Sequence, residues 1–185
     1  MASWHGQHHN DAIDQFHGSD SDVELVDGVV VRLSMPRFDH GDVCSTANFL
    51  IRDHVKKNDL GRVASNDTFV RTKLKPGSYR GADVCFISYA RLPKDQPRPK
   101  GPLESPPELV IEVRSPTDRP GEIDRKSAEY LSVGVTVVVV LDPEIESATV
   151  YRHTEEIPQR FSNGDELTLP DVLPGFSVPV RKFFE

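Results

Sequence analysis

The sequence predicts a mixed α/β (α+β) fold, in which one mixed sheet begins with a β-hairpin and is flanked by helices. Apolar runs at 82–88, 108–114 and 136–141 have the length and β-branched content of buried strands. Helical spacing occurs at 39–59 and again after residue 117, and the second helix indicates a crossover between two strands. The length of 185 residues suits one domain with a substantial core.

The N-terminal region divides into a tail and a hairpin. Residues 1–20 are polar, so we expect a disordered tail ahead of a single domain at 21–185. The tail contains four of the seven histidines, so an adventitious metal-binding tract is the alternative interpretation. A hairpin is expected at 23–33, because Asp27-Gly28 is a strong turn signal between two strand-like runs.

The first helix is expected at 39–59, where apolar residues recur at near-helical spacing. These residues are Val43, Ala47, Leu50, Ile51 and Val55. Asp39 or Asp42 is expected to cap its start, and Gly61 to end it. A strand at 62–74 follows, and the sheet then continues into the first of the apolar runs.

Residues 93–107 contain six prolines and cannot form regular structure. We expect an exposed, semi-rigid loop. One interpretation is an inert connector. The other is an arm beside the substrate, which would carry the cationic side chains of Lys94, Arg98 and Lys100.

The elements after the 108–114 strand alternate between helix and strand. A helix start is predicted at 117–120, and Gly134 is expected to close that helix. Four residues share one face of it: Ile123, Ser127, Tyr130 and Leu131. A strand at 148–151 should pair beside 136–141, and 167–184 reads as short strands and turns with a packed corner at 173–176.

Composition limits the possible functions. The net charge of -7 argues against a protein that coats DNA through many phosphate contacts. It does not argue against an enzyme whose metal ion neutralises phosphate locally, because such a site needs clustered carboxylates. We see no apolar run long enough to cross a membrane and no secretory signal, and so expect a cytoplasmic protein. Cys44 and Cys85 lack a CxxC spacing, so each thiol is expected to pack as a small residue.

Two carboxylates fall where strands should be buried. In 108–114 the side chains alternate, so Glu112 lies mid-strand on the face opposite Leu109, Ile111 and Val113. Asp83 opens another apolar strand, where aspartate is disfavoured. Buried carboxylates need a cation, a metal or a proton. Two of them on neighbouring strands can share a divalent ion such as Mg²⁺.

A cationic group would complete such a site. Lys126 lies on the helix that follows Glu112, one turn before Tyr130, so both side chains should leave the helix on one face. A lysine there could orient a water molecule and stabilise developing charge. On spacing alone, these three charged residues are more often structural ion-pair partners than catalysts.

A series of short motifs follows one another along the chain. They are Glu24-Leu25-Val26-Asp27-Gly28, His40, Ala82-Asp83-Val84, Glu112-Val113, Ser115-Pro116-Thr117-Asp118, Lys126, Tyr130, Gly134-Val135, Asp142-Pro143 and Leu173-Pro174-Gly175-Phe176. With these motifs the stretch 106–152 resembles the Uma-type family of restriction-endonuclease-like proteins. The motifs upstream and downstream of that stretch match in order, so the resemblance covers about 22–184.

The resemblance implies a restriction-endonuclease-like PD-(D/E)xK nuclease core. It implies that Asp83 and Glu112 are metal ligands and that Lys126, supplied from the helix, is the motif lysine. Glu24 corresponds to an acidic residue near the start, an outer or second ligand of the metal. His40 has a weaker claim as a site residue, because a histidine near a helix start can also cap or pack.

One departure from the family pattern concerns Arg114, where the family usually has an apolar residue. Arg114 is expected on the same face as Glu112. It could replace the missing motif lysine, clamp a phosphate, or neutralise Glu112 as an ion pair. The last option would argue against activity.

The sequence therefore predicts a Mg²⁺- or Mn²⁺-dependent DNA endonuclease. Its catalytic residues would be Asp83, Glu112 and Lys126, with Glu24 as a further metal ligand. His40, Arg114 and Tyr130 are additional candidate site residues. A homodimer is plausible from the resemblance. The alternatives are a catalytically inactive module that binds nucleic acid or protein, and an interaction protein that docks through the proline-rich loop.

Overall fold

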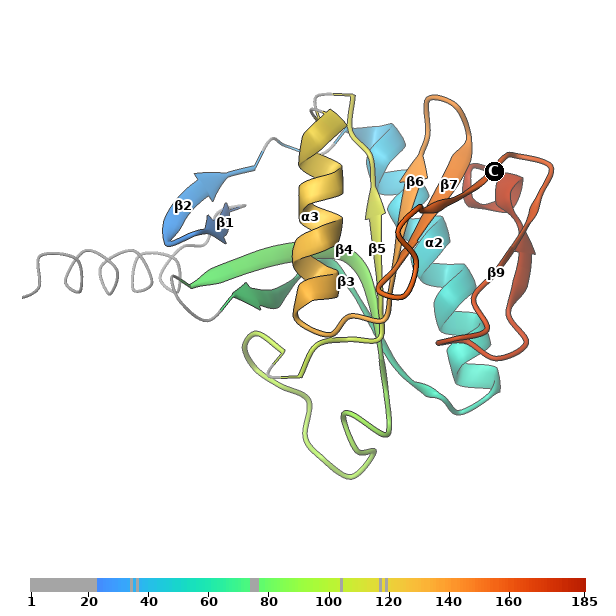
Figure 1. Cartoon of the computed structure of the whole chain (residues 1–185). Coiled ribbons are helices and arrows are strands. Elements are labelled where there is room, and N and C mark those ends of the chain that lie inside the picture. Colours follow the sequence, from blue (N-terminus) through green and yellow to red (C-terminus); the bar gives the residue numbers. More distant parts are fainter. Residues whose placement is uncertain are drawn as a thin grey trace, which may run out of the picture.

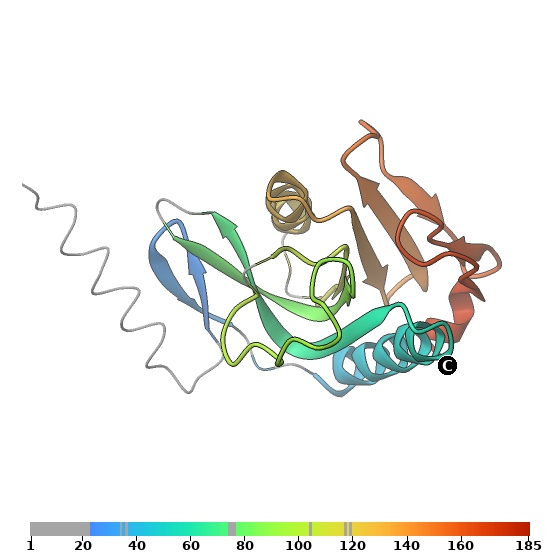
Figure 2. The ribbon, with the colours of Figure 1, turned by 90° about the horizontal axis from the view of Figure 1, so that it is seen from below.

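One mixed sheet of eight strands forms the centre of the fold in the computed structural model. Helix α2 (Phe38–Lys57) covers one face of this sheet and helix α3 (Pro120–Ser132) covers the other, as Figures 1 and 2 show. The structure describes residues 23–33, 35, 37–73, 77–103, 105–116, 118 and 120–185. The predicted tail lies outside these residues, so the division into a tail and one domain stays a prediction.

The strands follow the order β2-β1-β4-β5-β6-β7-β8, and β3 pairs with β4 beside this path. Their bounds are β1 (Val23–Val26), β2 (Val29–Arg32), β3 (Gly61–Lys73), β4 (Ser78–Ser88), β5 (Leu109–Val113), β6 (Val137–Asp142), β7 (Ser147–Arg152) and β8 (Gln159–Phe161). Strands β5 and β6 are parallel, and the pairs formed by the other strands of this sheet are antiparallel. Helix α3 makes the crossover between β5 and β6, which confirms the predicted mixed sheet.

The N-terminal hairpin forms as predicted and delivers one site residue to the sheet. Asp27 and Gly28 have φ values of 49° and 79°, the left-handed conformations that a tight hairpin turn requires. Val26 pairs with Val29 on the two sides of this turn. Leu25 pairs with Tyr79 of β4, and this pair joins the hairpin to the sheet. Glu24, the residue before Leu25, is thereby placed at the edge of β4.

Helix α2 matches its predicted position but not its predicted ends. Its buried stripe is Val43, Ala47, Ile51 and Val55. The expectation that Asp39 or Asp42 caps the start is wrong: Arg37 occupies the cap position without a side-chain hydrogen bond. Asp39 lies in the first turn, where its charge complements the helix dipole. At the other end, Asp59 takes the left-handed conformation (φ 52°), so Gly61 does not end the helix and instead begins β3.

Strand β4 is longer than the predicted 82–88 segment. Apart from Ser88 at its end, every residue of Ser78–Ser88 is buried, because the strand has neighbours on both sides and helices on both faces. Arg80 interrupts the apolar pattern, which is why the sequence suggested a later start. The arginine is 2% exposed and is held by carboxylates, as a buried guanidinium must be.

Side chains of β5 alternate between two cores. Leu109, Ile111 and Val113 pack in the core that faces α2, and Val110 packs with Tyr130 of α3 in the second core. This alternation confirms the prediction made for the two faces of the strand. It places Glu112 on the α3 side, where it meets polar side chains of that helix.

The C-terminal region adds a small second sheet of β9 (Glu166–Thr168) and β10 (Ser177–Pro179), followed by a short 3-10 helix, η1 (Val180–Phe183). Leu173 and Phe176 are buried, which confirms the packed corner. Strand β8 was not predicted, because its three residues are exposed or half-buried and lack apolar alternation.

The proline-rich loop packs against the main body through hydrogen bonds to its backbone. Nη2 of Arg62 lies 3.0 and 2.9 Å from the carbonyl oxygens of Lys94 and Gln96, and Lys94 forms an ion pair with Asp59. Lys94 is therefore engaged in holding the loop, in line with the connector interpretation. Among the described residues, no helix has the length and apolar character needed to span a bilayer.

Candidate active site

The candidate site lies where strands β4 and β5 separate. Their ladder ends at the pair Val84–Ile111, and the next opposed positions are Asp83 and Glu112. From there β4 continues its pairing with β3, while β5 continues with β6. The carboxylate of Asp83 accepts the N–H of Val113 at 2.6 Å, so a side chain takes the place of the missing strand–strand hydrogen bond.

Glu112 is 5% exposed, and both of its carboxylate oxygens have partners on α3. The ammonium of Lys126 lies 2.7 Å from Oε2, and the hydroxyl of Tyr130 lies 2.9 Å from Oε1. The two helix residues are four apart and share one face, as their spacing predicted. Two successive turns of α3 therefore anchor the carboxylate of the strand.

Lys126 points into the protein and connects three chain segments. In addition to Glu112, its ammonium donates to the carbonyl oxygen of Gly81 at 3.0 Å and lies 3.2 Å from Oε1 of Glu24. These three contacts come from the hairpin, from β4 and from β5. Lys126 is thus the residue that brings the sequence-distant parts of the site together.

Arg80 is a member of this network that the sequence analysis missed. Its guanidinium donates to Oε2 of Glu24 at 2.9 Å and to both carboxylate oxygens of Glu129 at 2.7 and 2.9 Å. Glu24 also accepts the N–H of Gly81 through Oε1 at 3.0 Å. An arginine inside an otherwise apolar strand was the available signal for this role.

The buried charges shift one another's pKa values. Burial is the main cause that raises the pKa of Glu112 to about 8, with Lys126 acting against it and Asp83 adding to it. Burial raises the pKa of Glu24 as well, but Lys126 and Arg80 outweigh burial and lower it overall. Burial lowers the pKa of Lys126, but Glu112 and the other carboxylates outweigh it, so the net shift is upward.

His40 and Cys44 approach Asp83 from helix α2. Nε2 of His40 lies 3.5 Å from Oδ2 of Asp83, and Sγ of Cys44 lies 3.5 Å from Nδ1 of the same ring. The hydrogen bond to Asp83 is the main cause that raises the pKa of His40. A cleft of about 280 Å³ opens beside these residues, between α2 and an irregular part of β3 at Asn66 and Asp67.

Arg114 forms its ion pair with Asp142 and not with Glu112. Its Nη1 donates to Oδ2 of Asp142 at 2.6 Å, at the end of β6. The interpretation that Arg114 neutralises Glu112 is therefore wrong. The physical reason is that Lys126 reaches Glu112 from the helix, while Arg114 follows the end of β5 and turns toward the neighbouring strand.

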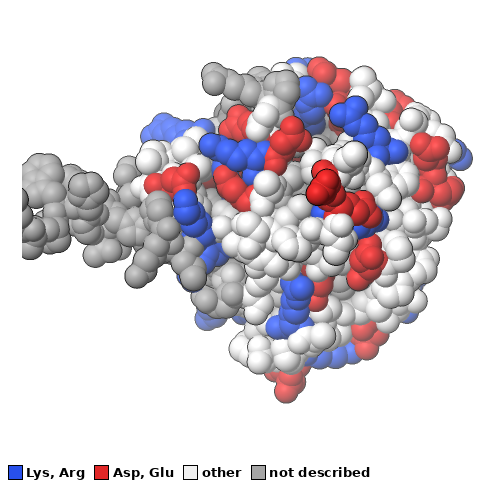
Figure 3. Space-filling view, in the orientation of Figure 1, with Lys and Arg blue, Asp and Glu red and all other residues white. Residues whose placement is uncertain are grey.

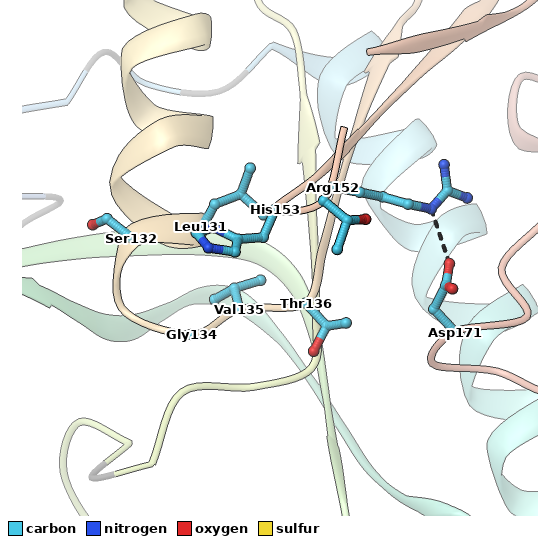
Figure 4. Close-up of a pocket in the computed structure, with 9 residues that line it drawn as sticks. Leu131, Ser132, Gly134, Val135, Thr136, Arg152, His153 and Asp171 are labelled. Atoms are coloured by element: carbon cyan, nitrogen blue, oxygen red, sulfur yellow. Dashed lines mark hydrogen bonds and ion pairs between the residues drawn. The ribbon is translucent and has the colours of Figure 1, made fainter. Parts of the chain in front are cut away.

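A second and larger cleft, of about 370 Å³, lies at the C-terminal end of α3. Figure 4 shows its lining, with the Arg152–Asp171 ion pair (2.9 Å) on one side and Leu131 to Thr136 on the other. It shares no lining residue with the Asp83 cleft. The strand fork brings together clustered carboxylates and a buried lysine, so the fork is the better candidate for chemistry.

Comparison with known proteins shows the family and the fold of the chain. A family model described as "Uma2: Putative restriction endonuclease" matches residues 11–181. The chain belongs to the Uma2 family. Among solved structures, a crystal structure from Anabaena variabilis ATCC 29413, described as "a putative nuclease belonging to DUF820", superimposes with a TM-score of 0.79. That match covers 93% of this chain and 96% of the other at 18% identity, and it supports the fold. No curated protein matches.

Membership of the Uma2 family confirms the resemblance that the motifs suggested, and with it a nuclease family and fold. The structure places Glu24, Glu112, Lys126 and Tyr130 in direct contact. Asp83 lies at the opposed strand position with His40 beside it, and Arg114 lies outside the network.

Proposed function

We propose that this Uma2 protein is a metal-dependent endonuclease that hydrolyses phosphodiester bonds in DNA. The observation that carries the proposal is the Lys126 ammonium, held 2.7 Å from Glu112 at the fork, where Asp83 occupies the opposed strand position. We also infer that the cation is Mg²⁺ or Mn²⁺, and that the protein acts in the cytoplasm, with a homodimer as its expected assembly.

The donor set fits a hard divalent cation. Four carboxylates and three cationic side chains meet at the fork, an excess of one negative charge when all the carboxylates are ionised. The carboxylates are Glu24, Asp83, Glu112 and Glu129, and the cations are Arg80, Arg125 and Lys126. Carboxylate oxygens are the protein ligands that Mg²⁺ prefers. Asp83 and Glu112 would hold the ion, with Glu24 as an outer ligand.

A bound divalent ion would supply Lewis acidity to the scissile phosphate and lower the pKa of a water molecule. The residues of the chain supply the remaining chemistry. Lys126 is held in place by Glu24 and the Gly81 carbonyl, so its ammonium can orient the attacking water and stabilise negative charge on the phosphate. Tyr130 keeps the carboxylate of Glu112 in one orientation. The water oxygen bonds to phosphorus, the P–O bond to the leaving strand breaks, and the net transfer of one water proton to the leaving oxygen completes the hydrolysis.

A nicking assay on supercoiled plasmid with Mg²⁺ or Mn²⁺ tests the proposal. We expect cleavage by the wild type and a loss of at least about 100-fold with Asp83→Ala or Lys126→Met, on the scale of removing one charge-stabilising group. Asp53→Ala on the exposed face of α2 is the matched control and should cleave like the wild type. Equal background rates for the wild type and Asp83→Ala would overturn the proposal.

A catalytically inactive binding module on the same fold is the second candidate. Both oxygens of Glu112 already have partners, and the net charge is -7. In such a module, the buried cationic side chains would compensate the charges of the carboxylates, and no metal ion would be needed. Calorimetry separates the candidates: the nuclease should take up Mg²⁺ or Mn²⁺ and lose that uptake in Glu112→Gln, whereas the inactive module takes up neither ion.

A further inference from the structure

A second set of ligand side chains lies on the α2 side of the fork. His40 and Cys44 are four residues apart on α2 and meet Asp83 of β4. One ligand atom from each residue lies within 4.8 Å of the other two. Nε2 of His40 lies 3.5 Å from Oδ2 of Asp83, and Nδ1 of the same ring lies 3.5 Å from Sγ of Cys44, so the imidazole has one of the other two ligand groups beside each of its nitrogens.

The donor types differ from those of the proposed magnesium site. A histidine nitrogen, a cysteine sulfur and a single carboxylate suit borderline-soft cations such as Zn²⁺ and Co²⁺. Magnesium demands oxygen ligands in an octahedron, so it would leave the thiol unused. The three residues therefore select a different class of ion from the one proposed for Asp83 and Glu112.

The surroundings leave a coordination position open. All three side chains line the cleft of about 280 Å³, which gives access from solvent. Asn48, one further turn along α2, lines the same cleft, and its Oδ1 is buried without a hydrogen-bond partner among the described residues. Three protein ligands with a free fourth position are typical of zinc sites that bind water or substrate.

We propose that His40, Cys44 and Asp83 form a site for a zinc-class divalent cation. This proposal is linked to the proposed nuclease function only by Asp83, which would be a ligand in both sites. Occupation by zinc would place a second positive charge at the fork and commit one carboxylate of the magnesium site to it. The Uma2 site would then respond to two metals of different chemistry.

Cobalt spectroscopy on the full-length, metal-free protein tests the inference. With one equivalent of Co²⁺ we expect a thiolate-to-cobalt charge-transfer absorption, displaced by Zn²⁺. Cys44→Ser should abolish the band and His40→Ala should weaken Co²⁺ binding by more than about tenfold, as expected for loss of a ligand. Cys85→Ser is the matched control, because that thiol is buried in the second core and should leave the band unchanged.

Two further variants separate the competing explanations. Replacing His5, His8, His9 and His17 by Asn should preserve the band, because those side chains carry no thiolate. Glu112→Gln should also preserve it while removing Mg²⁺ uptake, so each proposal can fail without the other. A melting temperature for Cys44→Ser within a few degrees of the wild type shows that it folds. A band that persists in Cys44→Ser, or Co²⁺ uptake without any thiolate band, would overturn the inference.

Discussion

At the scale of single residues, the site is a network in which buried cationic side chains and carboxylates contact one another in turn. Lys126 is held by two carboxylates and a carbonyl, and Arg80 is held by two carboxylates. Each group is buried or nearly so, where an unpaired charge would cost several kcal/mol. The network therefore has to form as a unit, and removing one member changes the protonation or the stability of the others.

Glu112 should make the cation-free protein less stable as pH rises. Its pKa is raised from 4.5 to about 8 on folding, so its contribution is complete below pH 4.5 and is lost as pH rises toward 8. We expect the wild type to lose on the order of 2–3 kcal/mol of unfolding free energy between pH 5 and 8 relative to Glu112→Gln. Urea denaturation in a chelating buffer measures this.

The exposed Glu122→Gln is the matched control for that titration and should follow the wild type. A Glu112→Gln curve parallel to the wild type would contradict the raised pKa.

Loss of the Arg80 side chain should lower the free energy of unfolding more than loss of a surface cation. Arg80→Met leaves Glu24 and Glu129 without their shared partner, and we expect a loss of about 3–5 kcal/mol. Lys57→Met, which breaks an exposed ion pair on α2, should cost less than about 1 kcal/mol. Chemical denaturation measures both losses.

The double variant Arg80→Met with Glu24→Gln tests the coupling between the two residues. Its loss should be smaller than the sum of the single losses by about 1 kcal/mol or more. Simple additivity would show that the two side chains do not act as a pair.

At the scale of elements, the site depends on how segments end and meet. The hairpin provides Glu24, the fork of β4 and β5 provides Asp83 and Glu112, and α3 closes the space above them. The α2–β3 connection sets the distance between helix and sheet on the other face. There the chain passes so close to β4 that Gly61 has no room for a side chain.

Gly61→Ala should be strongly destabilising for a steric reason. A Cβ at this position would collide with the carbonyl oxygen of Ile87 and the Cα of Ser88, which are backbone atoms. We expect a loss of about 2–3 kcal/mol, the usual cost of overpacking. Gly164→Ala is the control, because open space surrounds it and the cost should be below about 0.5 kcal/mol. Thermal denaturation that leaves the two variants equally stable would contradict the packing argument.

At the scale of the whole molecule, charge sets how DNA can be bound. Figure 3 shows acidic and basic side chains intermixed on the face that carries α3, without a continuous basic stripe. With a net charge of -7, the overall electrostatic field does not favour binding to a polyanion. The nuclease proposal therefore assigns phosphate recognition mainly to the local charges at the fork.

DNA binding should accordingly be weak and only mildly salt-dependent. We expect the logarithm of the binding constant to fall with the logarithm of salt concentration at a slope no steeper than about -3, as for three or fewer phosphate contacts. Fluorescence anisotropy with Asp83→Asn in the presence of Mg²⁺ measures this without cleavage. A slope near -8 would point to a basic surface elsewhere in the chain.

The sequence alone determined the helices, most strands and the pairing of Glu112 with the α3 face. These features depend on local periodicity and turn chemistry, which are visible in neighbouring residues. It also located Asp83, Lys126 and Tyr130 as candidates, because polar residues in apolar segments need partners.

Only the tertiary structure decided which partners meet. Arg114 could have reached Glu112 by strand alternation, yet it turns to Asp142. The position of Arg80 in an apolar strand indicated a buried partner but not which carboxylates, Glu24 and Glu129, it would join. The sequence indicated only that Cys44 packs as a small residue. In the structure, α2 places its thiol beside His40 and Asp83. The ion pairs of Arg114 and Arg80 join residues 28 to 56 positions apart, and their choice depends on helix rotation and strand register across the whole sheet.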